Sequence, residues 1–162
     1  MGDDELLRKI EELSSEEEIN RICYDALIKS SAPVKQYMDD FLDTHLEGNG
    51  IPWPYTQVTP ARGKGQSRRY YDNHAWWKGH RMSITVGYDF RDYVKGDHEQ
   101  QGALQALFLD IGTRTAGGTP VIEPTFFVYY AVRSSISEVE AIQNEVVAQH
   151  FTRIWNQSRR SG

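Results

Sequence analysis

The sequence predicts an α+β domain, and three observations carry that prediction. Apolar residues recur with helical spacing through the first 46 residues, alternate with polar residues over 81–88, and return to helical spacing beyond 124. Helices, then strands, then one long helix is the element order of an α+β domain. We therefore expect N-terminal amphipathic helices, a small mainly antiparallel β-sheet with a long loop or hairpin arm, and a long C-terminal helix packed on the sheet.

Length and composition indicate a single domain over residues 1–162. The chain is 39% hydrophobic and 25% charged, which allows one modest core. No apolar run approaches the roughly 18–20 residues of a membrane span, and the acidic start MGDDELLRKIEEL is unlike a secretory signal. We therefore expect no membrane partner. The single cysteine, Cys23, allows no internal disulfide, and its helical apolar surroundings predict a buried side chain.

The first 47 residues form an acidic helical part. Apolar residues repeat at three- and four-residue spacing from Asp3 to about Ser30, and Ser14-Ser15 before three glutamates predicts a helix cap and a break near 14. Pro33 suits the first turn of another helix over 33–46, and the glycines and prolines of EGNGIPWP end it.

Residues 51–81 form a basic, aromatic-rich arm or loop. They carry six basic residues and one acidic residue, whereas 1–47 carry 13 acidic and five basic residues. Basic groups interleaved with aromatic rings suit either a nucleic-acid site or a protein interface. The acidic chain as a whole and the lack of a nucleic-acid-reading motif favour the protein interface. The candidate oligomer-interface or DNA-lumen residues are Arg62, Lys64, Arg68, Arg69, Tyr70, Tyr71, Trp76 and Trp77.

Residues 82–123 are expected to hold strands and a glycine-rich turn. The segment 81–88 alternates Met82, Ile84 and Val86 with polar residues, as a half-buried strand does. The apolar run ALQALFLDI (103–111) is interpreted as a more deeply buried strand or a strand-like apolar run. Beyond Pro124, a closing helix is expected over 124–157. Its apolar residues are Ile136, Val139, Ile142, Val146, Phe151 and Ile154.

The turn contains the octet GTRTAGGT (112–119), which matches the phosphate-loop pattern except that Gly118 replaces the lysine. A phosphate loop needs a helix at its end, because the first N–H groups of that helix bind the phosphate. Pro120 and Pro124 favour an extended segment there instead. We therefore expect no nucleotide site and no cofactor.

No catalytic or metal site is expected. His74 and His80 are six residues apart, too far for one helix face, and no third ligand is near them in the sequence. Asp72-Asn73-His74 faintly resembles nucleases that hold a metal with His and Asn on a hairpin. Those enzymes need further ligands on a following helix, and Asn144 and His150 are distant in the sequence. No Ser/His/Asp or Cys/His nucleophile pattern has supporting local context, so the protein is not expected to be an enzyme.

The stretch FLDIGTRTAGGTPVIEPTFFVYYAV resembles the central signature of the neck and head–tail joining (tail-completion, tail-terminator-like) proteins of long-tailed bacteriophages. In that family a strand ends in an acidic residue, Gly-Thr follows after one position, and Pro and Phe lead into the closing helix. The matching residues are Asp110, Gly112, Thr113, Pro124 and Phe126. The chain departs from the family where NGIPWPYTQVTP replaces a Thr-Gly pair, and the arm 61–80 is its own.

The resemblance implies a structural virion protein, assembled in the bacterial host cytoplasm, that forms a ring in the phage neck. Such a ring joins the head connector or stopper to the tail tube and lets DNA pass without reading its sequence. A hexamer is favoured, with a dodecamer as the alternative, and the acidic helices would meet a neighbour's basic 61–81 arm. Two other hypotheses remain: a small nucleic-acid-binding protein or metal-dependent nuclease using the 61–81 region, and an immunity or inhibitor-type binding module.

Overall fold

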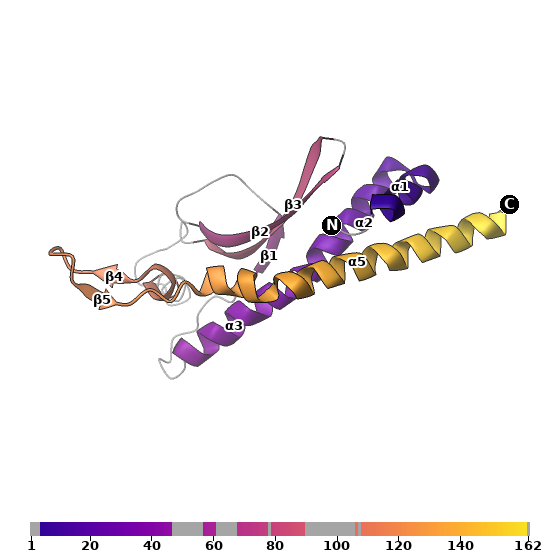
Figure 1. Cartoon of the computed structure of the whole chain (residues 1–162). Coiled ribbons are helices and arrows are strands. Elements are labelled where there is room, and N and C mark those ends of the chain that lie inside the picture. The colour runs from indigo at the N-terminus through magenta and orange to yellow at the C-terminus, as the bar shows by residue number, and fades with distance from the viewer. Residues whose placement is uncertain are drawn as a thin grey trace.

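The computed structural model describes residues 4–46, 57–60, 68–77, 79–89, 106 and 108–161. It has the expected α+β architecture, with N-terminal helices, a small antiparallel sheet and a long C-terminal helix (Figure 1). The elements are α1 (Asp4–Leu13), α2 (Glu16–Ser30), α3 (Ala32–Leu46), β1 (Gln57–Pro60), β2 (Arg68–Trp77), β3 (His80–Asp89), β4 (Thr113–Arg114), β5 (Pro120–Ile122) and α5 (Phe127–Ser161).

The N-terminal helices begin and end where the sequence predicts. Ser15 is the N-cap of α2, and its hydroxyl accepts a hydrogen bond from the backbone N–H of Glu18 at 3.2 Å. The predicted break near 14 is therefore confirmed. Only Ser31 separates α2 from α3, and α3 continues in nearly the same direction (Figure 1). The Ser31 hydroxyl donates to the Leu27 carbonyl at 2.7 Å, a type of bond that bends helices.

The main sheet has three antiparallel strands in the order β1-β3-β2. Met82, Ile84 and Val86 on β3 are buried, which confirms the strand expected at 81–88. Much of the predicted arm is the hairpin β2–β3, with Gly79 at its turn in a left-handed conformation (φ 77°). The hairpin alternative therefore holds for residues 68–77, and β1 also lies within the predicted arm.

The strand expected over 103–111 is wrong, because Ala106 and residues 108–111 are helical. The Gly112 N–H donates to the Phe108 carbonyl at 2.8 Å, a helical bond between residues four apart. Short apolar runs do not distinguish strands from buried helices, and Ala, Leu and Gln are strong helix formers. Ala106 and Asp110 are both buried at helical spacing.

The octet GTRTAGGT forms most of a second hairpin, β4–β5, rather than a turn after a core strand. The Thr115 N–H donates to the Thr119 carbonyl and the Gly118 N–H to the Thr115 carbonyl, each at 2.9 Å. Pro120 begins strand β5. The absence of a helix directly after the octet, predicted from Pro120 and Pro124, is thereby confirmed.

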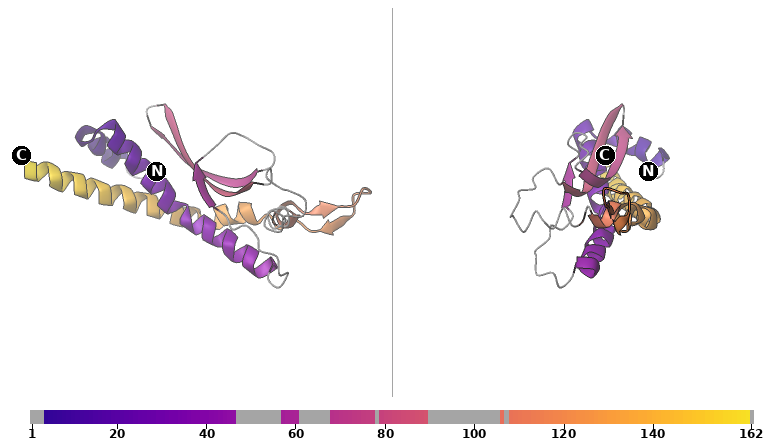
Figure 2. Two further views of the ribbon diagram at one scale, coloured as in Figure 1. Left: turned by 180° about the vertical axis from the view of Figure 1, so that it is seen from behind. Right: turned by 90° about the vertical axis from the view of Figure 1, so that its left-hand side faces the viewer.

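The closing helix α5 starts at Phe127, three residues after the expected 124, and ends at Ser161. Val139, Val146 and Ile154 are buried as expected, but Ile136 is 42% exposed, and Ser135 beside it is buried instead. The helices α1, α2 and α3 all pack along α5, and the sheet lies on one side of this helical layer (Figures 1 and 2). Among the described residues, no helix combines the length and the apolar character of a membrane span.

The core has two parts, and α5 contributes to both. The first joins α3, Val86 and the start of α5, where the Phe41 and Phe127 rings stack with centroids 4.6 Å apart. The second joins α1, α2, the start of β3 and the rest of α5. Cys23 belongs to the second part, and its burial raises the pKa of its thiol, as does the nearby Glu11 carboxylate. The expectation of a buried Cys23 is confirmed.

Candidate functional site

The five residues that resemble the neck-protein signature lie where the β4–β5 hairpin joins α5, although Asp110 lies in a helical turn here and not at the end of a strand as in that signature. Gly112 has a φ of 75°, and a Cβ built on it would lie 2.6 Å from the Ile122 carbonyl oxygen and 3.0 Å from Pro124. Thr113 pairs with Ile122 in the hairpin register. A side chain at position 112 would therefore meet both positive-φ strain and a backbone clash. We call residues 109–113 and 122–126 the hairpin joint.

Backbone hydrogen bonds close the hairpin joint. The Leu109 carbonyl accepts from the Thr125 N–H at 2.9 Å and from the Thr125 hydroxyl at 2.6 Å, and the Asp110 carbonyl accepts from the Phe126 N–H at 3.0 Å. These bonds satisfy carbonyls at the end of the helical turn that have no helical partner. Asp110 itself is fully buried. Residues 16 positions apart in the sequence are thus joined by hydrogen bonds.

Phe126 holds an unusual backbone conformation at this joint. Its φ is 50°, and it is the one non-glycine residue with positive φ among the described residues. Such a conformation costs about 1 kcal/mol or more in an L-residue. Its ring is 47% exposed, so burial within the chain does little to offset that cost. Strain of this kind is concentrated at functional sites.

Several exposed apolar residues lie in the joint or within a few residues of it along the chain. We call them the head surface: Ile111, Val121, Phe126, Tyr129 and Tyr130. The Tyr129 and Tyr130 rings lie edge to face with centroids 5.3 Å apart. The Arg133 guanidinium lies 6.0 Å from the Tyr129 ring centroid and donates to the Tyr129 hydroxyl at 3.0 Å. Exposed aromatic residues flanked by arginine are typical anchors of protein interfaces.

The hairpin that carries Val121, one residue of this surface, projects away from the body. Figure 1 shows β4 and β5 beyond the start of α5, at the end of the molecule opposite the C-terminus. Val121 on β5 is 66% exposed. A two-stranded hairpin has little stability alone and gains it from packing on something else.

The residues predicted in the basic arm are only partly placed. Arg62 and Lys64 lie outside the described residues, and Arg68, Arg69, Tyr70 and Trp77 are described only as backbone of β2. Trp76 is 65% exposed, as an interface residue should be. Tyr71 instead packs against the first core, and burial raises the pKa of its hydroxyl, as do the Asp72 and Glu140 carboxylates.

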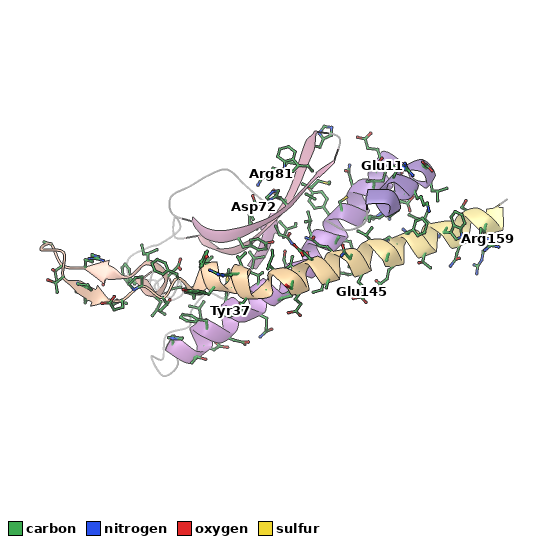
Figure 3. All side chains as sticks on the ribbon, in the orientation of Figure 1. Glu11, Tyr37, Asp72, Arg81, Glu145 and Arg159 are labelled. Carbon is green, nitrogen blue, oxygen red and sulfur yellow. The ribbon has the colours of Figure 1, made fainter. Side chains whose placement is uncertain are left out.

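The polar residues Asp72, His74 and Arg81 have contact partners within the same hairpin. The Asp72 carboxylate on β2 pairs with the Arg81 guanidinium on β3 (Figure 3). One ring nitrogen of the exposed His74 lies 3.2 Å from the Asp72 carbonyl oxygen. Within the described part of the chain, no three His, Cys, Asp or Glu side chains are grouped to hold a metal ion.

A buried polar cluster, which sequence reasoning missed, links three elements. It consists of Ser30, Ser31, Asn73 and Gln143. The Asn73 side-chain amide donates to the Leu27 carbonyl at 3.0 Å, to the Ser30 hydroxyl at 2.8 Å and to the Ser31 hydroxyl at 3.0 Å. The Gln143 amide donates to the Asn73 side-chain oxygen at 3.1 Å. One signal was available: Gln143 interrupts the apolar spacing between Val139 and Val146.

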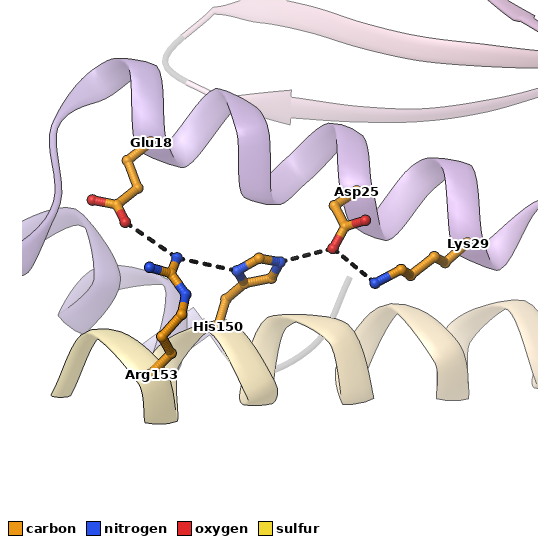
Figure 4. A network of polar contacts seen from close by, with 5 residues as sticks. All are labelled: Glu18, Asp25, Lys29, His150 and Arg153. Atoms are coloured by element: carbon orange, nitrogen blue, oxygen red, sulfur yellow. Dashed lines mark hydrogen bonds and ion pairs between the residues drawn. The ribbon is translucent and has the colours of Figure 1, made fainter. Parts of the chain in front are cut away.

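An ionic network on the surface ties α2 to α5 (Figure 4). The His150 Nε2 atom lies 2.8 Å from the Asp25 carboxylate, and the Arg153 guanidinium lies 3.2 Å from the Glu18 carboxylate. Lys29 also pairs with Asp25 at 3.2 Å. Burial raises the pKa of Asp25, but hydrogen bonds and charges from His150 and Lys29 outweigh it, so the net pKa is lowered.

Comparison of the chain with protein-family models, with curated proteins and with solved structures found no match.

Proposed function

We propose that this protein is a structural, non-enzymatic component of a tailed-phage virion, forming a homo-oligomeric ring in the neck between head connector and tail. The observation that carries the proposal is the hairpin joint. The residues that resemble the neck-protein signature lie together there, and one of them, Phe126, belongs to the exposed head surface. A sequence resemblance that coincides with one structural junction is stronger support than the same residues scattered over the fold.

The shape of the chain suits assembly into a ring. A closed ring needs two different surfaces on each subunit, so that contacts run head to tail until the rotation closes. The projecting hairpin supplies one such surface at one end of the molecule (Figure 1). Six copies are favoured, with twelve as the alternative, and DNA passes through the lumen without base-specific contacts. Trp76 on the β2–β3 hairpin is exposed as well.

Light scattering combined with negative-stain electron microscopy of the purified chain tests the proposal. Closed rings of one size are expected as the concentration is raised. Rings should also bind purified connector and tail-tube proteins of the same phage. A chain that stays monomeric at every concentration, and also with those proteins present, would contradict the proposal.

A DNA-cleavage assay tests the alternative, a nucleic-acid-binding protein or metal-dependent nuclease using the 61–81 region. The neck proposal predicts that plasmid DNA stays intact with added Mg²⁺ or Mn²⁺. Nicking that is abolished in His74→Ala would replace the neck proposal with the nuclease, since His74 is exposed on β2 beside Asp72.

A further inference from the structure

Exposed charged residues lie beside the apolar head surface, namely two arginines, Arg114 and Arg133, and one carboxylate, Glu123. Arg114 on β4 and Arg133 on α5 are both exposed, and neither pairs with an acidic side chain within the part of the chain that the structure describes. Their guanidinium groups instead donate to the Gly118 carbonyl and the Tyr129 hydroxyl. A partner of the head surface should therefore combine apolar residues with carboxylates.

One face of α2 has this combination. Tyr24 and Ile28 are exposed, and Glu17 lies on the same helical face, since spacings of seven and four residues both return to one side of a helix. Glu16 is exposed beside Glu17, and the cations in this part of α2 are Arg21, on the same face, and Lys29, which follows Ile28 and pairs with Asp25. We call Tyr24, Ile28, Glu16 and Glu17 the receiving surface.

The receiving surface is open because α5 occupies another side of α2. Glu18 and Asp25 turn toward α5, where they pair with Arg153 and His150 (Figure 4). Tyr24 and Ile28 take no part in the buried core. The head surface lies at the first turn of α5 and on the segment that precedes it, whereas α2 packs along the later part of α5 (Figures 1 and 2). The two surfaces therefore cannot meet within one chain.

We propose that the head surface of one copy docks on the receiving surface of the next copy of this chain. Phe126, Tyr129 and Val121 would pack on Tyr24 and Ile28, and Arg114 and Arg133 would face Glu16 and Glu17. The contact is heterologous, so it leaves a free surface at each end and extends until a ring closes. It rests on the proposed self-assembly and identifies the two surfaces that perform it. It differs from the contact that sequence charge suggested, between the acidic helices and the 61–81 arm.

Single substitutions on either surface should prevent assembly. Phe126→Ser or Val121→Asp on the head, and Ile28→Ser on α2, should each weaken self-association at least about tenfold, measured by analytical ultracentrifugation. Tyr37→Ser is the matched control, because Tyr37 is 36% exposed on α3 and belongs to neither surface. Circular dichroism should show that each variant stays folded. Head variants that assemble like wild type would overturn the inference.

Mixing the Phe126→Ser and Ile28→Ser chains distinguishes a heterologous contact from other modes of self-association. A Phe126→Ser chain keeps its receiving surface, and an Ile28→Ser chain keeps its head surface. Each alone should be monomeric, but the mixture should form one-to-one dimers that grow no further. Reversing both arginines to Glu should weaken assembly, and adding Glu16→Lys and Glu17→Lys should restore it.

The outcomes distinguish this inference from the proposed function. If the wild-type chain forms rings but the mixture of Phe126→Ser and Ile28→Ser chains stays monomeric, the docking mode is wrong and the neck proposal stands. Loss of assembly in Trp76→Ser, with normal assembly in Phe126→Ser, would assign the contact to the β2–β3 hairpin instead. A wild-type chain that is monomeric at its highest soluble concentration would overturn the docking of one copy on another.

Discussion

Gly112 is the residue on which the hairpin joint most directly depends. Gly112→Ala is expected to lower the free energy of unfolding by about 1–3 kcal/mol from its backbone conformation alone, with the clash against Ile122 and Pro124 adding to it. Urea denaturation measures the total. Hydrogen exchange at the Thr125 and Phe126 amides, which donate across the joint, measures the local part.

Two nearby glycines are matched controls for Gly112. Gly118 has a φ of 85° with nothing within 4 Å of a built Cβ, so Gly118→Ala should show conformational strain without a clash. Gly117 is not in the positive-φ region and has only the Thr115 hydroxyl nearby, at 3.9 Å, so Gly117→Ala should change stability little. Equal effects at positions 112 and 117 would show that the joint does not require a glycine.

Asn73 is the residue that holds the polar cluster together. Asn73→Ala should destabilise the protein by about 2–4 kcal/mol, because it leaves buried hydroxyl and amide groups unsatisfied and opens a cavity. Urea unfolding followed by circular dichroism measures this loss. The exposed neighbour His74 on the same strand is the control, and His74→Ala should stay within about 0.5 kcal/mol of wild type.

The pairing of α2 with α5 should depend on pH through Asp25. A carboxyl whose pKa is lowered in the folded state adds stability above its unfolded pKa, about 3.9. That stability is lost as the pH falls through the folded pKa. Asp25→Asn should therefore cost about 1 kcal/mol or less at pH 7 and lose less stability than wild type between pH 7 and pH 3.

Urea unfolding at both pH values measures the Asp25 effect. Glu17→Gln makes the same change of charge on an exposed part of α2 and should leave the acid-induced loss of stability close to that of wild type. An Asp25→Asn chain with the full wild-type loss would show that its contacts with His150 and Lys29 do not couple α2 to α5.

Element type was predictable wherever a long segment had one clear spacing. The three N-terminal helices, the strand at 81–88 and the closing helix all follow from the repeat of apolar residues. The helical turn at 108–111 was missed because nine residues of mostly apolar character fit either structure. The sequence could not show that Gly112 lies against Ile122 and Pro124, because that contact depends on how the hairpin folds back.

At the scale of the whole molecule, the polar cluster lies at the boundary between the two core parts. On α5, Gln143 falls between Val139 of the first part and Val146 of the second. Along α2 and α3, Ser30 falls between Leu27 of the second core part and Val34 of the first core part. Amphipathic spacing predicts which face of each element is buried, but not which elements meet there. The sequence alone could therefore not predict a network that joins residues 42 to 113 positions apart.

The whole molecule should fold without the tip of the β4–β5 hairpin but should not assemble without it. Thr113 already pairs with Ile122, so a two-residue Asn-Gly turn can replace residues 114–121 and connect them directly. β4 and β5 pack mainly on each other, so the free energy of unfolding should stay within about 0.5 kcal/mol of wild type. Self-association should fall at least about tenfold, because Arg114 and Val121 are removed from the head surface.

Urea denaturation and analytical ultracentrifugation measure the two quantities on the same preparation, with Gly117→Ala as the full-length control. If the shortened chain is as unstable as Asn73→Ala, the hairpin is required for folding. If the shortened chain assembles normally, the hairpin takes no part in the contact between subunits.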